Sequence, residues 1–394
     1  MPDETCRRCK IAVVIPKYGL TGGAEGFAAE LTERLAARPD FEIHVFANRW
    51  VSASERVTFH KVPIIKFPRS LSSPSFAFFA GRAIIAAGPF DIIHTHDRIF
   101  TADVYTMHGI PHRWWIREVR KKRLSLFDRS LVAVEDHLVL QGGCRRFLAV
   151  SGLVRDIFFS EYPVDPSLVR VIHPGVDTAP YEKLNRDTCR QAIRERYSIG
   201  LDETLILFVS MNFDVKGLDY LLRGLSLLRR RNPEASFTLL VAGHGDEKKY
   251  RHLASEQGIA DRVIFAGAVK REKLPEFYLA ADIYAMLSRF DTFGMVVLEA
   301  MAAGLPVLIS GRVGAKDLVV EGGNGFVVEN PENGEAIADA VKKLLSPELR
   351  DTMQRASLKT AAENSWETTV EKVVSIYKEI LADQRRVNSK IPQP

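Results

Sequence analysis

The stretch at residues 280–309 limits the fold more than any other part of the chain. It begins with an apolar run, 280–286, which predicts a short buried strand. A mostly apolar segment at about 293–303 predicts a helix, because a Gly-Leu-Pro sequence follows it and ends it. A second apolar run at 307–309 predicts the next strand. Strand, turn, helix and strand in this order indicate a parallel α/β sheet, which binds ligands at the carboxyl ends of its strands.

The helix of this unit carries candidate ligand groups at its start. The first-turn N–H groups of Met295 and Val296 have no partner within a helix and suit a phosphate. Glu299 lies one turn further along, on the same face as Met295, and its carboxylate can accept hydrogen bonds from two neighbouring hydroxyls, such as those of a ribose. Alternatively, Asp291 only caps the helix and Glu299 is solvated. The apolar residues around Glu299 favour a carboxylate with partners.

The spacing of Asp291 and Glu299, followed by Ala-Met-Ala-Ala-Gly-Leu-Pro-Val, resembles the signature of retaining glycosyltransferases of family four. That family usually has Glu at the position of Asp291. The resemblance implies the GT-B fold, an α/β fold with two Rossmann-like domains facing a central cleft. It also implies transfer of a hexose from a nucleotide sugar to an acceptor hydroxyl with retained configuration. A closer resemblance at 212–219, Asn-Phe-x-x-Lys-Gly-Leu-Asp, is to members that glucosylate the lipopolysaccharide core, which implies a UDP-glucose donor and a lipid-linked glycan acceptor.

Further site residues follow predicted strands. Gly22 and Gly23 come after the first apolar run, where glycines allow a ligand to approach the backbone closely, and they resemble the family's glycine loop. Lys216 is either a solvated lysine or, as the resemblance implies, the lysine that stabilises the donor diphosphate as a point charge. His108 precedes Gly109 and resembles the family histidine beside the donor sugar, and Asp103 is a second candidate for that neighbourhood.

Two residues near these candidates in the sequence bear on their assignment. His94 also falls near a strand end, and we interpret it as a core histidine with satisfied hydrogen bonds. The family often has an arginine shortly before its phosphate-binding lysine, whereas this chain has Met211 there. The candidate catalytic residues are therefore His108, Asp103 and Asp291, and the candidate donor-binding residues are Gly22, Gly23, Lys216, Met295, Val296 and Glu299.

Length and hydropathy predict two domains, because 394 residues with 46% hydrophobic content exceed one ordinary core. The resemblance implies an acceptor domain at 1–178, a nucleotide-sugar domain at 179–365, and a helix at 366–394 that returns to the first domain and ends in a tail. No apolar run reaches the roughly 18 residues of a membrane span. Arg82 interrupts the longest candidate, 76–90, which we predict to be a buried helix. The N-terminus lacks an apolar signal-peptide core, so we expect a cytoplasmic protein.

The segment at 113–123 has the most unusual composition, with six cations and one acid, a net +5 that equals the charge of the whole chain. The spacing predicts a helix that places Trp115 on an apolar face and its cations at i, i+4. Aromatic and cationic residues together suit an anionic membrane surface. The alternative is a solvated helix with its tryptophans in the core. The candidate membrane contacts are Arg113, Trp114, Trp115, Arg117, Arg120, Lys121 and Lys122, which would hold the protein on the inner face of the cytoplasmic membrane.

Other function classes are weaker. The chain has no Asp-x-Asp motif, so we expect activity without a divalent metal and no cofactor besides the nucleotide-sugar substrate. A single basic stretch is not a basic face, so no nucleic-acid partner is predicted. Two alternatives stay open: a GT-B nucleotide-sugar epimerase, which would need no acceptor, and a weakly active sugar-nucleotide-binding protein, which the methionine at position 211 would favour.

Overall fold

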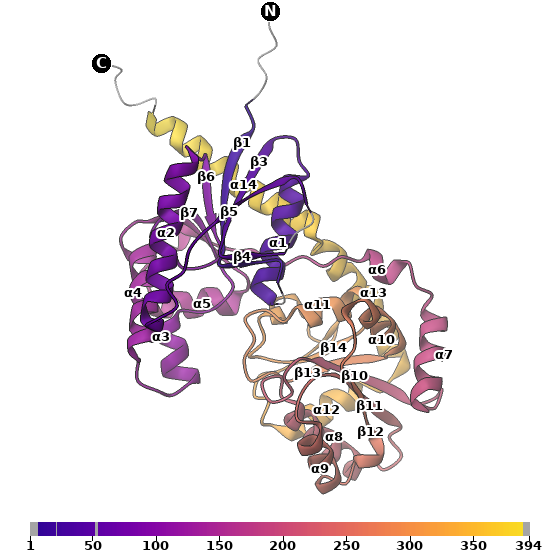
Figure 1. The fold of residues 1–394 in the computed structure, drawn as a ribbon. Helices are drawn as coiled ribbons and strands as arrows, with labels where there is room; N and C mark the ends of the chain where they lie inside the picture. The colour runs from indigo at the N-terminus through magenta and orange to yellow at the C-terminus, as the bar shows by residue number, and fades with distance from the viewer. Residues whose placement is uncertain (1–6, 21, 52–53, 389–394) are drawn as a thin grey trace, which may run out of the picture. The chain divides into compact units, whose positions relative to one another are not determined.

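The computed structural model describes residues 7–20, 22–51 and 54–388. The chain divides into two compact units, one made of residues 1–174 with 366–394 and the other of residues 175–365 (Figure 1). Each unit is an α/β domain built on a parallel sheet, so the predicted pair of Rossmann-like domains is confirmed. The division lies four residues before the boundary expected from the sequence.

The sheet of the first unit has seven parallel strands in the order β5-β3-β1-β6-β7-β8-β9. The strands are β1 (Cys9–Val14), β3 (Phe41–Ala47), β5 (Val57–Lys61), β6 (Ile92–Thr95), β7 (Ala102–Met107), β8 (Cys144–Ala149) and β9 (Val169–Val171), and a separate parallel pair joins β2 (Lys17–Tyr18) to β4 (Arg49–Trp50). The chain order reverses between β1 and β6. Such a reversal, a topological switch point, is where open α/β sheets bind ligands.

Five longer helices and four short helical turns accompany this sheet. They are α1 (Gly23–Ala36), η1 (Arg69–Leu71), α2 (Ser72–Ala87), α3 (His112–Trp114), η2 (Trp115–Val119), α4 (Leu126–Leu140), α5 (Gly152–Glu161), η3 (Pro166–Leu168) and α14 (Trp366–Asn388). The last helix packs on α1, with the rings of Phe27 and Trp366 5.3 Å apart and an ion pair between Arg38 and Glu371. This helix begins at the expected residue 366 and continues to Asn388. The prediction that α2 is buried is only half right, because Phe78 and Ile85 are exposed.

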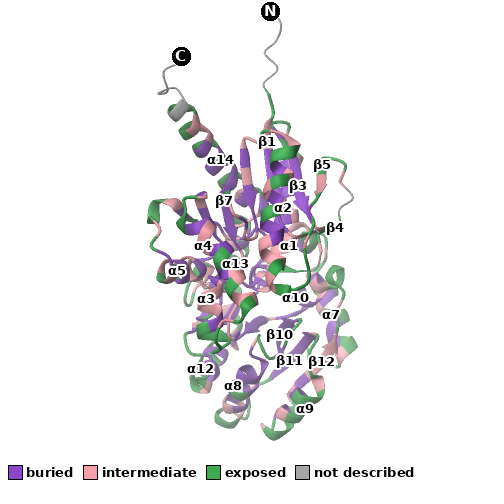
Figure 2. Cartoon of the chain, turned by 60° about the vertical axis from the view of Figure 1, so that its left-hand side comes forward, coloured by how far each residue is buried: buried purple, intermediate pink, exposed green. Residues whose placement is uncertain are grey.

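The sheet of the second unit has six parallel strands in the order β12-β11-β10-β13-β14-β15. They are β10 (Thr204–Ser210), β11 (Phe237–Gly243), β12 (Val263–Gly267), β13 (Ile283–Met286), β14 (Val307–Ser310) and β15 (Gly325–Val328). Here the switch point lies between β10 and β13. Figure 2 shows β10 and β11 in the buried colour, as expected for parallel strands covered on both faces.

The helices of the second unit alternate with these strands. They are α6 (Ala179–Glu182), α7 (Arg186–Tyr197), α8 (Leu218–Arg231), α9 (Glu247–Glu256), η4 (Ala260–Arg262), η5 (Arg271–Lys273), α10 (Leu274–Ala280), α11 (Met295–Ala302), η6 (Gly314–Leu318), α12 (Gly334–Leu344) and α13 (Pro347–Glu363). The predicted sequence of strand, turn, helix and strand at 280–309 is confirmed as β13, α11 and β14. The core holds apolar side chains from α8 and α12 together with those of the central strands.

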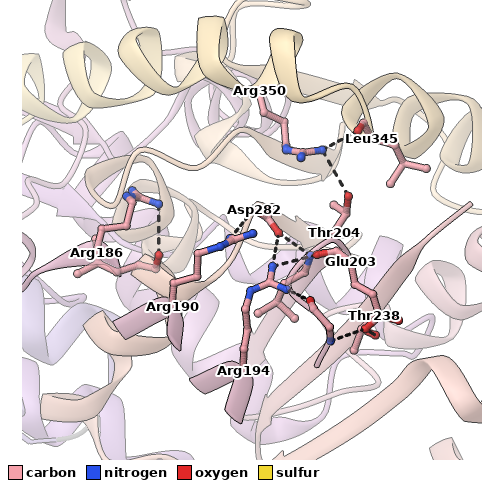
Figure 3. A network of polar contacts seen from close by, with 12 residues as sticks. Arg186, Arg190, Arg194, Glu203, Thr204, Thr238, Asp282, Leu345 and Arg350 are labelled. Carbon is pink, nitrogen blue, oxygen red and sulfur yellow. Dashed lines mark hydrogen bonds and ion pairs between the residues drawn. The ribbon is translucent and has the colours of Figure 1, made fainter. Parts of the chain in front are cut away.

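A polar network at the amino edge of this sheet holds α7 in place (Figure 3). Asp282, which directly precedes β13, accepts hydrogen bonds from Arg190 at 2.7 Å, from Arg194 at 2.8 Å and from the backbone N–H of Leu205 at 2.7 Å. Arg194 is 1% exposed and also donates to the carbonyl oxygens of Glu203, at 2.9 Å, and Gly200. The carboxylate therefore joins one helix to the starts of two neighbouring strands.

We predict that Asp282→Ala destabilises the protein by about 3–5 kcal/mol, because it leaves two guanidinium groups, one of them fully buried, without their carboxylate. The measurement is the free energy of unfolding in urea. The matched control is Asp339→Ala, which breaks an exposed pair with Arg231 and should cost less than about 1 kcal/mol. Equal losses in the two variants would mean that the network adds no more than a surface ion pair.

Candidate active site

Two loops at the switch point of the second unit carry the candidate diphosphate-binding residues. One loop follows β10 and contains Lys216, and the other follows β13 and contains Asp291. Both loops leave the carboxyl edge of the sheet, and they leave it from adjacent strands. The sequence predicted the edge, because it places the candidates after buried strands. The network around Asp282 lies at the opposite edge, because that residue precedes β13.

Hydrogen bonds fasten the first loop to the second. The carbonyl oxygen of Val215 accepts from the backbone N–H of Arg289 at 2.8 Å and from the hydroxyl of Ser288 at 2.9 Å. Gly217 has φ +71°, and a Cβ at this position would overlap the carbonyl oxygen of Leu287. Only glycine meets both conditions without strain, so the Lys-Gly pair reflects the close approach of the two loops.

Lys216 is not the solvated lysine of the alternative interpretation. Its Nζ forms an ion pair with Oδ2 of Asp291, and only 23% of its side chain and 15% of that of Asp291 are exposed. The second oxygen of Asp291 accepts from the backbone N–H of Phe293 at 3.3 Å, so the carboxylate also shapes the turn into α11. A diphosphate that bound Lys216 would therefore either replace Asp291 as the partner of this lysine or share the lysine with Asp291.

The start of α11 presents the expected groups beside this pair. Gly294, with φ +92°, precedes the helix, and Met295 and Val296 form its first turn. The carboxylate of Glu299 accepts a hydrogen bond from the hydroxyl of Tyr278 at 3.2 Å. Burial raises the pKa of Glu299, while Arg271 and the Tyr278 hydrogen bond lower it in part. Glu299 is thus a partnered carboxylate, as its apolar surroundings predicted.

The first unit places its candidates at the carboxyl edge of its own sheet. His108 directly follows β7, Gly22 and Gly23 lie at the start of α1, and the ring of Phe27 in α1 contacts that of His108 at 4.8 Å. Burial lowers the pKa of His108 to about 3, so its imidazole is neutral at physiological pH.

Asp103 does not lie beside His108. It is five residues earlier, near the amino end of β7, at about 3.3 Å per residue along a strand. Its carboxylate accepts from the backbone N–H of Ile93 at 2.8 Å and pairs with Arg145 at 3.1 Å. The two candidates therefore occupy opposite parts of the strand, and the function proposed below does not use Asp103.

His94 is a core histidine, as predicted. One ring nitrogen bonds the hydroxyl of Tyr377 at 2.6 Å and the other that of Thr106 at 2.7 Å. The side chain is fully buried, and burial lowers its pKa to about 3. The neighbouring His96 was not a candidate, although the His-Thr-His sequence brings its ring within 4.4 Å of His94 and onto the edge that carries His108. Tyr278 was missed because only tertiary packing brings α10 to Glu299.

The basic segment differs from the prediction. Helical structure stops at Val119, and Lys121 has φ +48°, so the expected i, i+4 row does not continue to it. Arg113 pairs with Asp136 at 2.8 Å, and Arg117 pairs with Glu118 and Glu161, each at 2.5 Å. Trp114 and Trp115 are half-buried, and Arg120, Lys121, Lys122 and Arg123 are exposed.

Comparison with known proteins agrees with this architecture. A family model described as "Glycosyl transferases group 1" matches residues 190–364, and one described as "Glycosyltransferase Family 4" matches residues 21–180. A D-inositol 3-phosphate glycosyltransferase of Acidothermus cellulolyticus is 28% identical over 94% of this chain and 88% of its own length. The uncharacterized glycosyltransferase MJ1607 of Methanocaldococcus jannaschii is 30% identical over 75% of this chain and 77% of its own.

Solved structures share the fold. WaaG, a glycosyltransferase involved in lipopolysaccharide biosynthesis, superimposes with a TM-score of 0.77 at 21% identity, over 93% of this chain and 99% of its own. Alr3699/HepE of Anabaena, in complex with UDP-glucose, gives a TM-score of 0.70 at 17% identity, over 94% and 99%. With two parallel-sheet domains, matches to both family models and these relatives, the chain belongs to the group 1 glycosyltransferases and has the GT-B fold.

Proposed function

We propose that this glycosyltransferase is a retaining hexosyltransferase that takes glucose from UDP-glucose. The observation that carries the proposal is the arrangement at the switch point of the second unit, where Lys216 and Asp291 meet beside the first turn of α11 and Glu299 lies one turn inside. The complex of Alr3699/HepE with UDP-glucose supports this choice of donor.

In the proposed reaction, Lys216 and the first-turn N–H groups of Met295 and Val296 balance the charge of the diphosphate. The carboxylate of Glu299 accepts hydrogen bonds from the ribose hydroxyls. The bond between the sugar C1 and the phosphate oxygen breaks while a bond from C1 to the acceptor oxygen forms on the same face. The leaving phosphate takes the proton of the acceptor hydroxyl. The chain thus acts by orientation and charge stabilisation, without a protein nucleophile.

The first unit supplies the remaining proposed contacts. The family resemblance implies that His108, which follows β7, contacts the donor sugar, and that the backbone at Gly22 and Gly23, at the start of α1, approaches the diphosphate or the acceptor closely. Met211, at the position of the family's arginine, is exposed and contributes no charge. Lys216 is therefore the main cation of the proposed diphosphate site, which gives its removal a large expected effect.

For the acceptor we propose a lipid-linked glycan, such as a lipopolysaccharide core. The resemblance at 212–219 and the similarity to WaaG support this choice. An inositol phosphate is the second candidate, because the relative from Acidothermus cellulolyticus carries that name. The epimerase alternative draws no support from the comparisons.

A membrane-facing surface of the first unit accompanies the lipid-linked acceptor in this proposal. We define the basic apolar surface as residues 65–71 and 120–127. The two segments meet where the guanidinium of Arg69 lies 4.4 Å from the ring centre of Phe127. Phe67 is 89% exposed and Leu126 76% exposed. Exposed apolar side chains among cations suit the interface of an anionic leaflet.

The charge of this surface comes from four cations that follow the end of the helical segment at Val119. Arg120, Lys121, Lys122 and Arg123 form no ion pair with any residue within 7–20, 22–51 or 54–388. Near an anionic leaflet each cation contributes about 1 kcal/mol, so these four supply roughly 4 kcal/mol before salt screening. None of the described helices is long and apolar enough to span a bilayer. The contact that we propose is peripheral and on the inner face of the cytoplasmic membrane.

We predict that Lys216→Ala and Glu299→Ala each lower kcat/KM for UDP-glucose by about 10- to 150-fold, the range for loss of one charge-assisted hydrogen bond. The assay is release of UDP at subsaturating donor. Lys249→Ala is the matched control for the lysine, since Lys249 pairs with Asp214 in an exposed position. Wild-type turnover in both site variants would show that the donor binds elsewhere.

We predict that the chain sediments with anionic liposomes at low salt and is released at high salt, because the surface charge is screened. Changing Arg120, Lys121, Lys122 and Arg123 together to Gln should abolish sedimentation at low salt, and Phe67→Ser should weaken it there. The control changes Arg113 and Arg117 to Gln, since these two are already paired within the protein. Equal binding by the wild type and the quadruple variant would rule out this surface.

A further inference from the structure

His96 forms a hydrogen bond that determines which nitrogen of His108 carries a proton. Its Nδ1 lies 2.9 Å from Nε2 of His108, and the two rings stack at 5.2 Å. One of these two nitrogens must donate and the other must accept, because both imidazoles are neutral. Burial lowers the pKa of both histidines, and the neighbouring His94 lowers that of His96 further.

The surroundings of the other nitrogen of His96, Nε2, indicate which of the two nitrogens in this hydrogen bond is the donor. His96 is 6% exposed, and its Nε2 is buried without a hydrogen-bond partner among the residues that the structure describes. If that nitrogen carried the proton, a buried N–H would be left without an acceptor. A buried donor without a partner is rarer in proteins than an unused acceptor. The favoured tautomer of His96 therefore has its proton on Nδ1.

Three contacts hold the rings of His96 and His108 in place. The N–H of His96 donates to the carbonyl oxygen of Val14 at 2.9 Å, which extends the pairing of β6 with β1 by one residue. His94 stacks on one side of His96 at 4.4 Å, and its own nitrogens are fully occupied by Tyr377 and Thr106. Phe27 packs its ring against His108. These contacts keep the two rings next to each other, and a flip of either imidazole would break the hydrogen bond between Nδ1 of His96 and Nε2 of His108.

We propose that His96 is a positioning residue that holds His108 as its Nδ1–H tautomer. The Nδ1–H of His96 donates to Nε2 of His108, which leaves Nδ1–H of His108 to donate to an oxygen of the donor substrate. No hydrogen bond joins that Nδ1 to another residue of the described chain. This inference rests on the proposed function for the assignment of His108 to the donor site, but not for the tautomer itself.

The first test is spectroscopic and needs no activity. In long-range ¹H–¹⁵N correlation spectra of the full chain labelled with ¹⁵N-histidine, the protonated and bare nitrogens of a neutral imidazole have distinct shifts. The chain has ten histidines, and the signals of His108 are assigned by their loss in His108→Gln. We expect His108 to be protonated on Nδ1. Protonation on Nε2 in the wild type would overturn the proposal.

The second test uses variants of His96. His96→Asn keeps an N–H donor near the position of Nδ1 and should preserve both the tautomer and most of the turnover. His96→Leu removes the donor, so His108 should show both tautomers and kcat/KM for UDP-glucose should fall roughly 2- to 10-fold, the range for one neutral hydrogen bond. An unchanged tautomer in His96→Leu would overturn the proposal, and the wild-type spectrum decides if that variant does not fold.

A second histidine pair provides the control. Nδ1 of His44 lies 2.8 Å from Nε2 of His60 in the same unit, between β3 and β5. His60→Leu should break that pair and leave the signals of His108 and the turnover unchanged. Failure of the proposed function has a different outcome: His108→Gln would keep wild-type donor use while the wild-type spectrum still showed the Nδ1–H tautomer.

Discussion

The reversal of strand order in each parallel sheet is the constraint on which the rest of the structure depends. Parallel strands are buried on both faces, so the chain must leave them through loops at the sheet edges. Where the order reverses, two adjacent strands send their connections to opposite faces, and the loops that follow these strands are neighbours at the carboxyl edge. In the second unit those loops carry Lys216 and Asp291, and in the first unit they carry the glycine pair and His96.

Charged side chains are arranged differently at the two edges of the second sheet. At the amino edge, Asp282 accepts three hydrogen bonds, one of them from the buried guanidinium of Arg194, and this network holds α7. At the carboxyl edge, a single lysine meets a single carboxylate, and both keep some exposure. A bound diphosphate can replace the carboxylate of such a partly exposed ion pair at a small cost in free energy. Breaking the network around Asp282 would instead leave buried charges without partners. The buried charge network and the proposed donor-binding pair therefore lie at opposite ends of the same strands.

The basic segment illustrates how tertiary contacts redistribute charge. Its net +5 is a property of composition, but Asp136 and Glu161, from distant parts of the chain, neutralise Arg113 and Arg117. The cations that remain exposed follow the end of the helix and precede Phe127, whose ring Arg69 contacts. An anionic partner stays a prediction. The tertiary contacts leave Arg120, Lys121 and Lys122 as candidates to meet it and remove Arg113 and Arg117.

The sequence by itself determined the α/β class, the strands and helices near residues 280–309, and the placement of Lys216, Asp291 and His108 after buried strands. Those features depend on local hydropathy and on glycines at fixed turns, which a sequence displays directly. Only the tertiary structure decided that Asp103 lies at the wrong end of β7, that Tyr278 reaches Glu299, and that His96 pairs with His108. The reason is physical: these outcomes depend on strand order, on packing between helices far apart in the chain and on which buried polar atoms find partners, and none of these has a local pattern.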